Sequence, residues 1–151
     1  MSDNATAITI LIADDDPDDR LLIRDALEDS RLANDIDFVV DGEDLMDYLN
    51  RANGYESLNG KSLPGLILLD LNMPKKDGRE ALKEIKASDS LKRIPVVVLT
   101  TSKAEEDIYR TYDLGVNSFI VKPVTFEKLV KVMRTVTDYW TQIVQLPPQA
   151  A

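Results

Sequence analysis

The chain has 151 residues, of which 44% are hydrophobic and 30% are charged, which is typical of one globular domain and not of a disordered or membrane chain. A formal net charge of -9 repels a phosphate backbone, so we expect no nucleic-acid partner. The absence of cysteine and histidine excludes disulfides, thiolate metal sites and imidazole chemistry.

The first predicted elements are a strand and a helix. The apolar, β-branched run at residues 8–13 predicts a strand covered on both faces. Asp16 then stands as a helix-capping carboxylate before Pro17, and apolar residues recur at helical spacing at Leu21, Leu22, Ala26 and Leu27. We expect Asp18 and Asp19 to be first-turn acids favoured by the helix dipole, with no functional role.

The same alternation continues toward the C terminus. Strands are predicted at residues 36–40, 66–69, 96–99 and 118–121, and helices at 44–51, 79–87, 105–114 and 126–144. Gly115 is suited to end the helix at 105–114. Turn-forming Asn-Gly and Pro-Gly pairs predict a long loop at residues 51–65. This (βα)5 alternation predicts an α/β fold with a five-stranded parallel sheet and helices on both faces.

Domain organisation follows from these elements. Residues 1–7 lack the basic and apolar regions of a secretory leader, and no apolar run is long enough to span a membrane. We therefore expect an N-terminal tail at 1–7, one folded domain at 8–142 and a C-terminal tail at 143–151. The expected location is cytoplasmic, with no membrane contact.

Polar residues directly follow four of the predicted strands. The strand ends carry Asp14-Asp15-Asp16, Asp70-Leu71-Asn72, Thr100-Thr101-Ser102 and Lys122-Pro123. Because the carboxyl ends of parallel strands meet at one edge of a sheet, we expect these side chains to converge there. Clustered carboxylates repel one another, and an oxygen-seeking divalent cation relieves that repulsion. Magnesium fits best, because it uses one or two carboxylates and leaves positions for phosphate oxygens.

These motifs resemble those of the receiver domains of two-component response regulators, from residue 8 to about residue 142. The motifs are Ala13-Asp14-Asp15, Leu69-Asp70-Leu71-Asn72-Met73-Pro74 followed by Gly78, Leu99-Thr100-Thr101 and Val121-Lys122-Pro123. The resemblance implies a flavodoxin-like, doubly wound sheet with strand order 2-1-3-4-5. It also implies a stand-alone regulator that receives a phosphoryl group from a sensor histidine kinase and is not itself an enzyme.

The resemblance implies a role for each residue at the strand ends. Asp70 would be the phosphoacceptor and, with Asp14, Asp15 and Asn72, would hold Mg²⁺. Within that set Asp15 would be a direct ligand, Asp14 would act mainly through water, and Asn72 would use its backbone carbonyl. Thr100, Thr101 and Lys122 would hold phosphoryl oxygens.

Phe119 matches the aromatic switch position of the family. By the resemblance, Phe119 would rotate inward when Thr100 moves, altering the face formed by the fourth helix, fifth strand and fifth helix. From spacing alone, Phe119 is explained equally well as a core residue. The long loop before Asp70 and the run Asp70 to Glu80 further resemble single-domain regulators paired with bacterial and cyanobacterial phytochromes, so the kinase partner could be a phytochrome.

Other functions remain open at this point. A magnesium-dependent phosphohydrolase with an aspartyl-phosphate intermediate is the main alternative, although such enzymes need an acid where Asn72 stands. A nucleotide or flavin binder lacks a glycine-rich phosphate loop after the first strand. A pseudo-receiver that only docks partners would not need the complete set of acids, threonine and lysine.

The C-terminal helix carries more apolar residues than one sheet face needs. One helical stripe is expected to cover the sheet: Phe126, Leu129, Val130, Met133 and Val136. A second set is then surplus: Val132, Tyr139, Trp140, Ile143, Val144 and Leu146. Exposed apolar surface with aromatic anchors marks an interface, so we expect a homodimer through this helix and tail. The alternative is a tail folded back onto its own domain.

Overall fold

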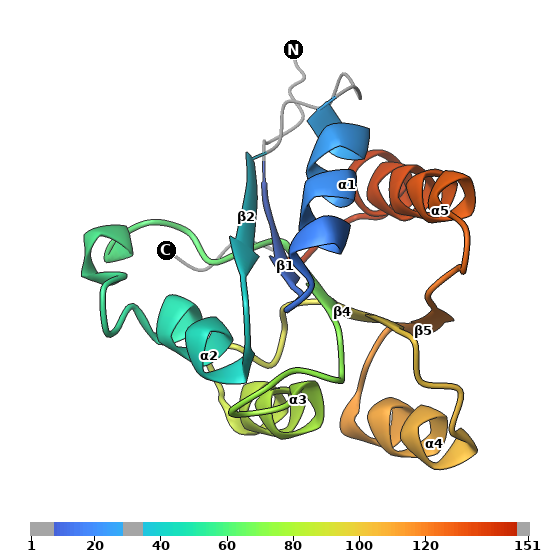
Figure 1. The fold of residues 1–151 in the computed structure, drawn as a ribbon. Coiled ribbons are helices and arrows are strands. Elements are labelled where there is room, and N and C mark those ends of the chain that lie inside the picture. Colours follow the sequence, from blue (N-terminus) through green and yellow to red (C-terminus); the bar gives the residue numbers. More distant parts are fainter. Residues whose placement is uncertain (1–7, 29–34, 148–151) are drawn as a thin grey trace.

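The structure, a computed structural model, describes residues 8–28 and 35–147. The predicted N-terminal tail at 1–7 and the last residues of the predicted C-terminal tail lie outside this range. Within it, five parallel strands form one sheet in the order β2-β1-β3-β4-β5, as predicted (Figure 1). The strands are β1 (Thr9–Ala13), β2 (Asp35–Val39), β3 (Leu66–Leu69), β4 (Val96–Thr100) and β5 (Ser118–Val121).

Five helices alternate with these strands, and local capping signals explain where most of them begin. The helices are α1 (Pro17–Glu28), α2 (Gly42–Asn50), α3 (Gly78–Ala87), α4 (Glu105–Leu114) and α5 (Phe126–Asp138). Asp16 Oδ1 accepts a hydrogen bond from the Asp18 amide at 2.9 Å, which confirms Asp16 as a cap. Helix α2 begins two residues earlier than predicted, because the Asp41 side chain caps it. Gly115 ends α4 with a φ of 105°, as predicted.

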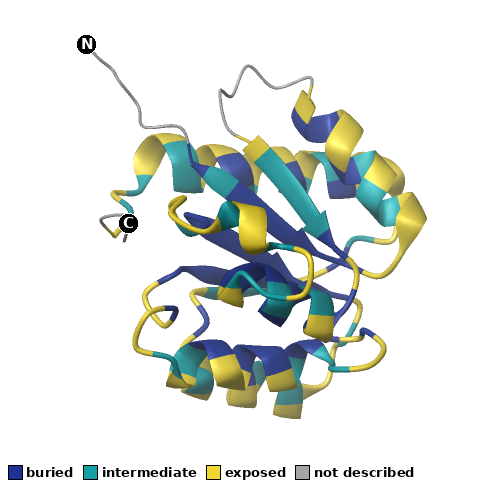
Figure 2. Ribbon diagram, turned by 90° about the vertical axis from the view of Figure 1, so that its left-hand side faces the viewer, coloured by how far each residue is buried: buried dark blue, intermediate teal, exposed yellow. Residues whose placement is uncertain are grey.

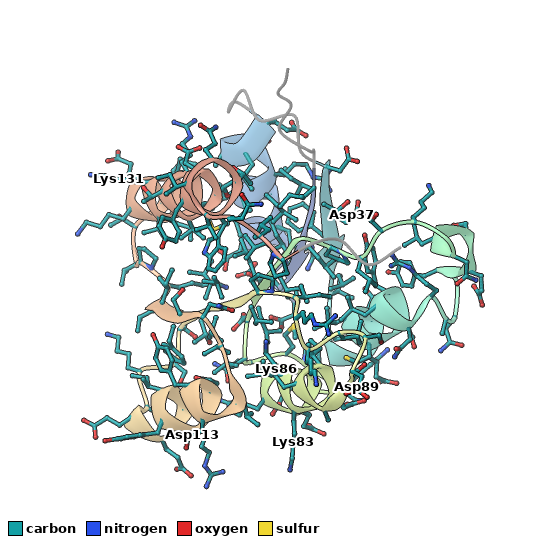
Figure 3. The ribbon with its side chains drawn as sticks, turned by 180° about the vertical axis from the view of Figure 1, so that it is seen from behind. Asp37, Lys83, Lys86, Asp89, Asp113 and Lys131 are labelled. Carbon is teal, nitrogen blue, oxygen red and sulfur yellow. The ribbon has the colours of Figure 1, made fainter. Side chains whose placement is uncertain are left out.

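The helices cover both faces of the sheet. Helices α1 and α5 lie on one face, and α2, α3 and α4 lie on the other (Figure 1). Alternate residues along the strands pack into two apolar clusters, one facing α2 and α3 and the other facing α1 and α5. The central strands β1, β3 and β4 are therefore largely buried, the edge strands β2 and β5 are partly buried, and the outer helix surfaces are exposed (Figure 2). Charged residues such as Lys83, Asp113 and Lys131 lie on those outer surfaces (Figure 3).

The long loop before β3 is fastened to α2, which in turn bonds β2. It contains a short 3₁₀ turn, Glu56–Leu58. The Tyr55 hydroxyl donates to Asp44 at 2.6 Å, and the Tyr48 hydroxyl donates to Asp37 on β2 at 2.5 Å. The two tyrosine rings pack edge to face, 5.2 Å apart. These contacts give the loop a defined path beside α2.

The C-terminal segment differs from the prediction. The α-helix ends at Asp138 and continues as one π-helical turn, Tyr139–Ile143, so the predicted helix at 126–144 is only partly α-helical. Part of the apolar set predicted to be surplus packs on the domain's own core: Val132, Trp140 and Leu146. Phe126, expected to cover the sheet, is instead 52% exposed. Tyr139 and Ile143 stay exposed, at 49% and 73%.

Candidate functional site

Three of the predicted acids meet at the carboxyl edge of the sheet. Strands β1 and β3 pair in register up to Ala13 and Leu69, which places Asp14 beside Asp70. Carboxylate oxygens of Asp14, Asp15 and Asp70 lie within 4.8 Å of one another. Asp14 and Asp70 are buried, whereas Asp15 is exposed. The sequence therefore correctly predicted that these acids converge.

Lys122 lies at the centre of this cluster. Its ammonium donates to Asp14 Oδ2 at 2.7 Å, to Asp19 Oδ2 at 2.8 Å and to Asp70 Oδ2 at 3.3 Å. Burial acts to lower the pKa of Lys122, but the hydrogen bonds that it donates to Asp14 and Asp19 outweigh this effect and hold the pKa above its usual range. Lys122 is therefore charged throughout the physiological pH range.

Asp19 is a member of the site that sequence reasoning missed. It was expected to be a first-turn acid without a function, yet it is one of the three carboxylates bound to Lys122. Asp19 lies one turn of α1 beyond the strand-end acids, and its side chain faces the same sheet edge. Only the three-dimensional placement of Lys122 distinguishes it from Asp18.

The acids suit a hard divalent cation. Burial raises the pKa of Asp14, although hydrogen bonds from Lys122 and from the Asp16 amide counteract that rise. Asp14 is thus a buried carboxylate that faces two further acids, Asp15 and Asp70. Converging carboxylate oxygens of this kind are the donors that Mg²⁺ and Mn²⁺ prefer. The residues present therefore fit a divalent metal.

The remaining predicted residues lie on strands β4 and β5 or just after strands β3 and β4. The Asn72 amide donates to Asp70 Oδ1 at 3.2 Å, and Asn72 itself is exposed. Thr100 is fully buried at the end of β4, while Thr101 is exposed. Phe119 on β5 is partly buried against the α2–α3 core cluster. This packing accommodates either interpretation of Phe119, so its switch role stays a prediction.

Comparison with known proteins identifies the family. Residues 10–134 match the family model described as the response regulator receiver domain. The chain is a response regulator receiver domain. The predicted family and fold are thereby confirmed.

Relatives of this receiver domain include phytochrome-associated regulators. It is 41% identical over 138 residues to the response regulator Rcp1 of Synechocystis sp., across 91% of this chain and 92% of Rcp1. The solved structure of the phosphorylated cyanobacterial phytochrome response regulator RcpA matches with a TM-score of 0.88 and 42% identity, across 95% of this chain and 100% of that one. The Mn²⁺-bound form of Rcp1 matches with a TM-score of 0.87 and 40% identity, across 93% and 99%.

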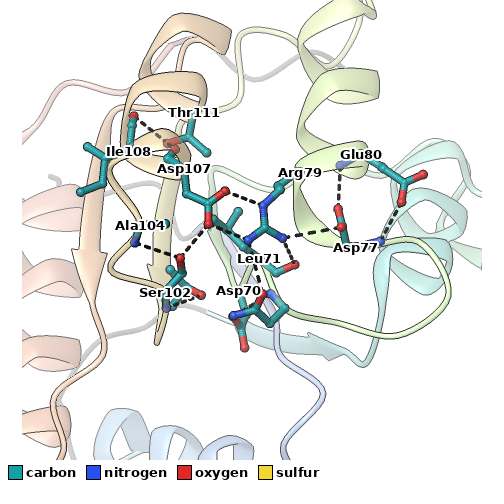
Figure 4. Close-up of polar contacts among 12 residues, drawn as sticks. Asp70, Leu71, Asp77, Arg79, Glu80, Ser102, Ala104, Asp107, Ile108 and Thr111 are labelled. Atoms are coloured by element: carbon teal, nitrogen blue, oxygen red, sulfur yellow. Dashed lines mark hydrogen bonds and ion pairs between the residues drawn. The ribbon is translucent and has the colours of Figure 1, made fainter.

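A second polar cluster of the receiver domain adjoins the site and was not predicted. Arg79, at the start of α3, donates through Nε and Nη2 to the two carboxylate oxygens of Asp107 on α4, each at 2.7 Å (Figure 4). The Ser102 hydroxyl donates to the same carboxylate at 2.6 Å. Arg79 lies 28 positions before Asp107 in the sequence, and no local pattern signals their contact. Arg79 and Ser102 together lower the pKa of Asp107 to about 2.

The lowered pKa predicts how Asp107 contributes to stability at acid pH. A carboxyl group whose folded-state pKa is below its unfolded value of 3.8 contributes stability above pH 3.8, and that contribution disappears as the pH falls through about 2. Asp107→Asn should therefore cost about 1 kcal/mol at pH 7, since the pair is partly exposed. Urea unfolding should show the difference from wild type shrinking between pH 4 and pH 2. A difference independent of pH would contradict this assignment.

Proposed function

We propose that Asp70 accepts a phosphoryl group from a sensor histidine kinase, and that the protein works as a single-domain regulator in two-component signalling. The observation that carries the proposal is the position of the buried Asp70 carboxylate, beside the Lys122 ammonium and within the acid cluster. A carboxylate is an adequate nucleophile for phosphorus when cations offset the charge of the phosphoryl oxygens. Membership of the receiver family supports the same role.

Lys122 is placed to serve both the resting and the phosphorylated site. Its bond to Asp70 is the longest of its three, while shorter bonds to Asp14 and Asp19 anchor the ammonium from the other side. The donor directed at Asp70 can therefore turn to a phosphoryl oxygen while the other two bonds remain. Thr100, at the end of the neighbouring strand β4, would supply its hydroxyl to another phosphoryl oxygen.

Asp14, Asp15, Asp70 and the backbone carbonyl of Asn72 would hold the metal, which we propose to be Mg²⁺. Bound there, Mg²⁺ would supply positive charge to the phosphoryl oxygens. Asp14 is already engaged by Lys122 and by the Asp16 amide, whereas Asp15 is exposed at the mouth of the site. One buried acid and one exposed acid suit a metal that also keeps water ligands.

The difference between these two acids gives a testable ranking. Asp15→Ala should weaken Mg²⁺ binding by about tenfold or more, while Asp14→Ala should weaken it less, because Asp14 acts mainly through water. Titration calorimetry with MgCl₂ measures both affinities directly. Asp16→Ala, which removes an exposed cap outside the cluster, serves as the control and should bind Mg²⁺ as wild type does. Equal losses of Mg²⁺ affinity in Asp14→Ala and Asp15→Ala would contradict the different roles proposed for the two acids.

Phosphorylation itself can be tested without knowing the kinase. Acetyl phosphate with Mg²⁺ should label the protein, and chelation by EDTA should prevent it. Borohydride reduction of the acyl phosphate followed by peptide mass spectrometry should place the label at Asp70. A label on any other residue would refute the assignment of Asp70.

The phosphohydrolase alternative predicts a different result. Asn72 stands where such an enzyme needs an acid, and its side chain instead lies 3.4 Å from Arg79 Nη2. We therefore propose that the protein is a signalling switch and not an enzyme with external substrates. Sustained release of phosphate from a generic phosphomonoester, abolished by Asp70→Asn, would favour the hydrolase instead.

We propose that the kinase partner is of the phytochrome type, because the solved relative RcpA is a phytochrome response regulator. We propose that the protein is cytoplasmic, where such kinases find ATP. Among the described residues, no helix is both long and apolar enough to cross a membrane.

Changes at Phe119 would alter the face built from α4, β5 and α5, where Tyr109, Val121 and Val124 are exposed.

We also propose a homodimer through the C-terminal segment, now centred on Tyr139 and Ile143. These side chains stay exposed while Trp140 and Leu146 pack on the domain itself. Ile143→Asp should convert the dimer to a monomer at tens of micromolar, with labelling at Asp70 unchanged. Leu21→Asp, at another exposed apolar position, is the control and should leave the dimer intact. Wild-type protein that sediments as a monomer would exclude the dimer.

A further inference from the structure

Helix α4 has fewer buried residues than any of the other four α-helices. Of its ten residues, all within the described part of the chain, Thr111 is the buried one. Its N-cap is Ala104, whose side chain cannot accept a hydrogen bond. Helices α2, α3 and α5 instead begin at the capping side chains of Asp41, Asp77 and Thr125. The position of the first turn of α4 must therefore be set by residues outside the helix.

Arg79 supplies that external contact. Its guanidinium binds both oxygens of Asp107, the third residue of α4, in the paired geometry that fixes orientation as well as distance (Figure 4). The Ser102 hydroxyl also donates to Asp107 and lies 3.4 Å from the Ala104 amide, which donates to it. Arg79 and Ser102 thus hold the start of α4 in place of a local cap.

Arg79 also contacts the two residues that directly follow Asp70 in the chain. Its guanidinium reaches the Leu71 carbonyl at 3.5 Å and Asn72 Oδ1 at 3.4 Å, the two residues after Asp70. The residue before it, Gly78, donates to the Leu71 carbonyl at 2.9 Å. A Cβ at Gly78 would lie 2.3 Å from the Asp70 carbonyl oxygen, so only glycine permits this approach. The backbone that leads into Arg79 therefore lies in close contact with the backbone of Asp70.

We propose that Arg79 is a positioning residue that ties the first turn of α4, through Asp107, to the loop that carries Asp70 and to the loop that follows Thr100. The coupling part rests on the proposed function. Ser102, two residues after Thr100, bonds to the same carboxylate as Arg79. Movement of either loop when a phosphoryl group binds at Asp70 must change the geometry around Asp107. Helix α4 then responds to the site without itself touching the phosphoryl group.

Amide hydrogen exchange followed by mass spectrometry tests whether Arg79 holds the first turn of α4. This first experiment uses Mg²⁺ without any phosphoryl analogue. Arg79→Ala should raise the exchange rate of amides at residues 103–110 about tenfold. Arg79→Lys should recover little of the protection, because lysine keeps the charge but cannot bind both oxygens. Arg110→Gln is the matched control: it breaks the exposed Arg110–Glu106 pair on the same helix and should exchange as wild type does. Equal exchange in Arg79→Ala and Arg110→Gln would overturn the tie.

The same variants with beryllofluoride, a phosphoryl analogue, test the coupling. In wild type, beryllofluoride should change exchange both around Asp70 and in α4. In Arg79→Ala the change around Asp70 should persist, while the change in α4 should fall to less than one third of its wild-type size. An undiminished response of α4 would overturn the coupling even if the tie is real. A wild-type protein with no response around Asp70 would instead overturn the proposed function, and the tie would then be judged on the exchange in Mg²⁺ alone.

Discussion

Asp70→Asn is expected to abolish phosphorylation and, without divalent metal, to make the protein more stable. The amide is close in shape to the carboxylate but is a poor nucleophile, so labelling by acetyl phosphate should be lost. The substitution also removes one negative charge from the cluster that Asp70 forms with the buried Asp14 and the exposed Asp15. We expect a gain of about 1 kcal/mol, or about 2–4 °C in the unfolding midpoint for a domain of this size.

Thermal unfolding in EDTA and in MgCl₂ separates the two effects. In EDTA, Asp70→Asn should unfold at a higher temperature than wild type. Added MgCl₂ should stabilise wild type more than the variant, because the variant has lost a metal ligand. Asp113→Asn, an exposed acid on α4, is the control and should resemble wild type in both buffers. A lower midpoint for Asp70→Asn in EDTA would argue against repulsion within the cluster.

The sequence predicted the sheet and the core of the site because both depend on local patterns. Apolar runs mark buried strands, and in a parallel sheet the residue after each strand falls at one edge. Asp14, Asp70, Thr100 and Lys122 could thus be placed together without coordinates. Helix ends with capping signals, such as Asp16 and Gly115, were also predictable.

Residues that act across elements could not be predicted in this way. Asp19 and Asp18 have the same local environment in the sequence, and only the path of β5 brings Lys122 to one of them. The Arg79–Asp107 pair joins two helices whose separation depends on how they pack on the sheet. The C-terminal segment was misjudged because Trp140 was counted as surplus, although it lies seven residues after Met133 and four after Val136, at the helical spacing of the core-facing stripe. Trp140 consequently packs on the core, while Tyr139 stays exposed.

Lys122→Ala should have the opposite effect to Asp70→Asn and a larger one. The substitution leaves Asp14, Asp19 and Asp70 without the ammonium to which all three are bound. Removing one partner of a buried ion pair costs about 3–5 kcal/mol, because the remaining charges are desolvated and uncompensated. At neutral pH without metal, much of the stability of a domain this size would be lost. The variant should still take up some phosphate in Mg²⁺ but should not pass the change to partners.

The pH dependence identifies the cause of this loss. In wild type, burial already raises the pKa of Asp14, and the hydrogen bond from Lys122 limits the rise. Without Lys122 the folded-state pKa must rise further above the unfolded value of 3.8. A group with a raised folded-state pKa contributes most stability below its unfolded pKa and loses that contribution as the pH rises through the folded pKa. The deficit of Lys122→Ala, measured by urea unfolding in EDTA, should therefore shrink as the pH is lowered toward 4. Lys131→Ala, on the exposed face of α5, should show no such deficit, and a loss of stability in Lys122→Ala that is constant with pH would point to lost packing instead of uncompensated charge.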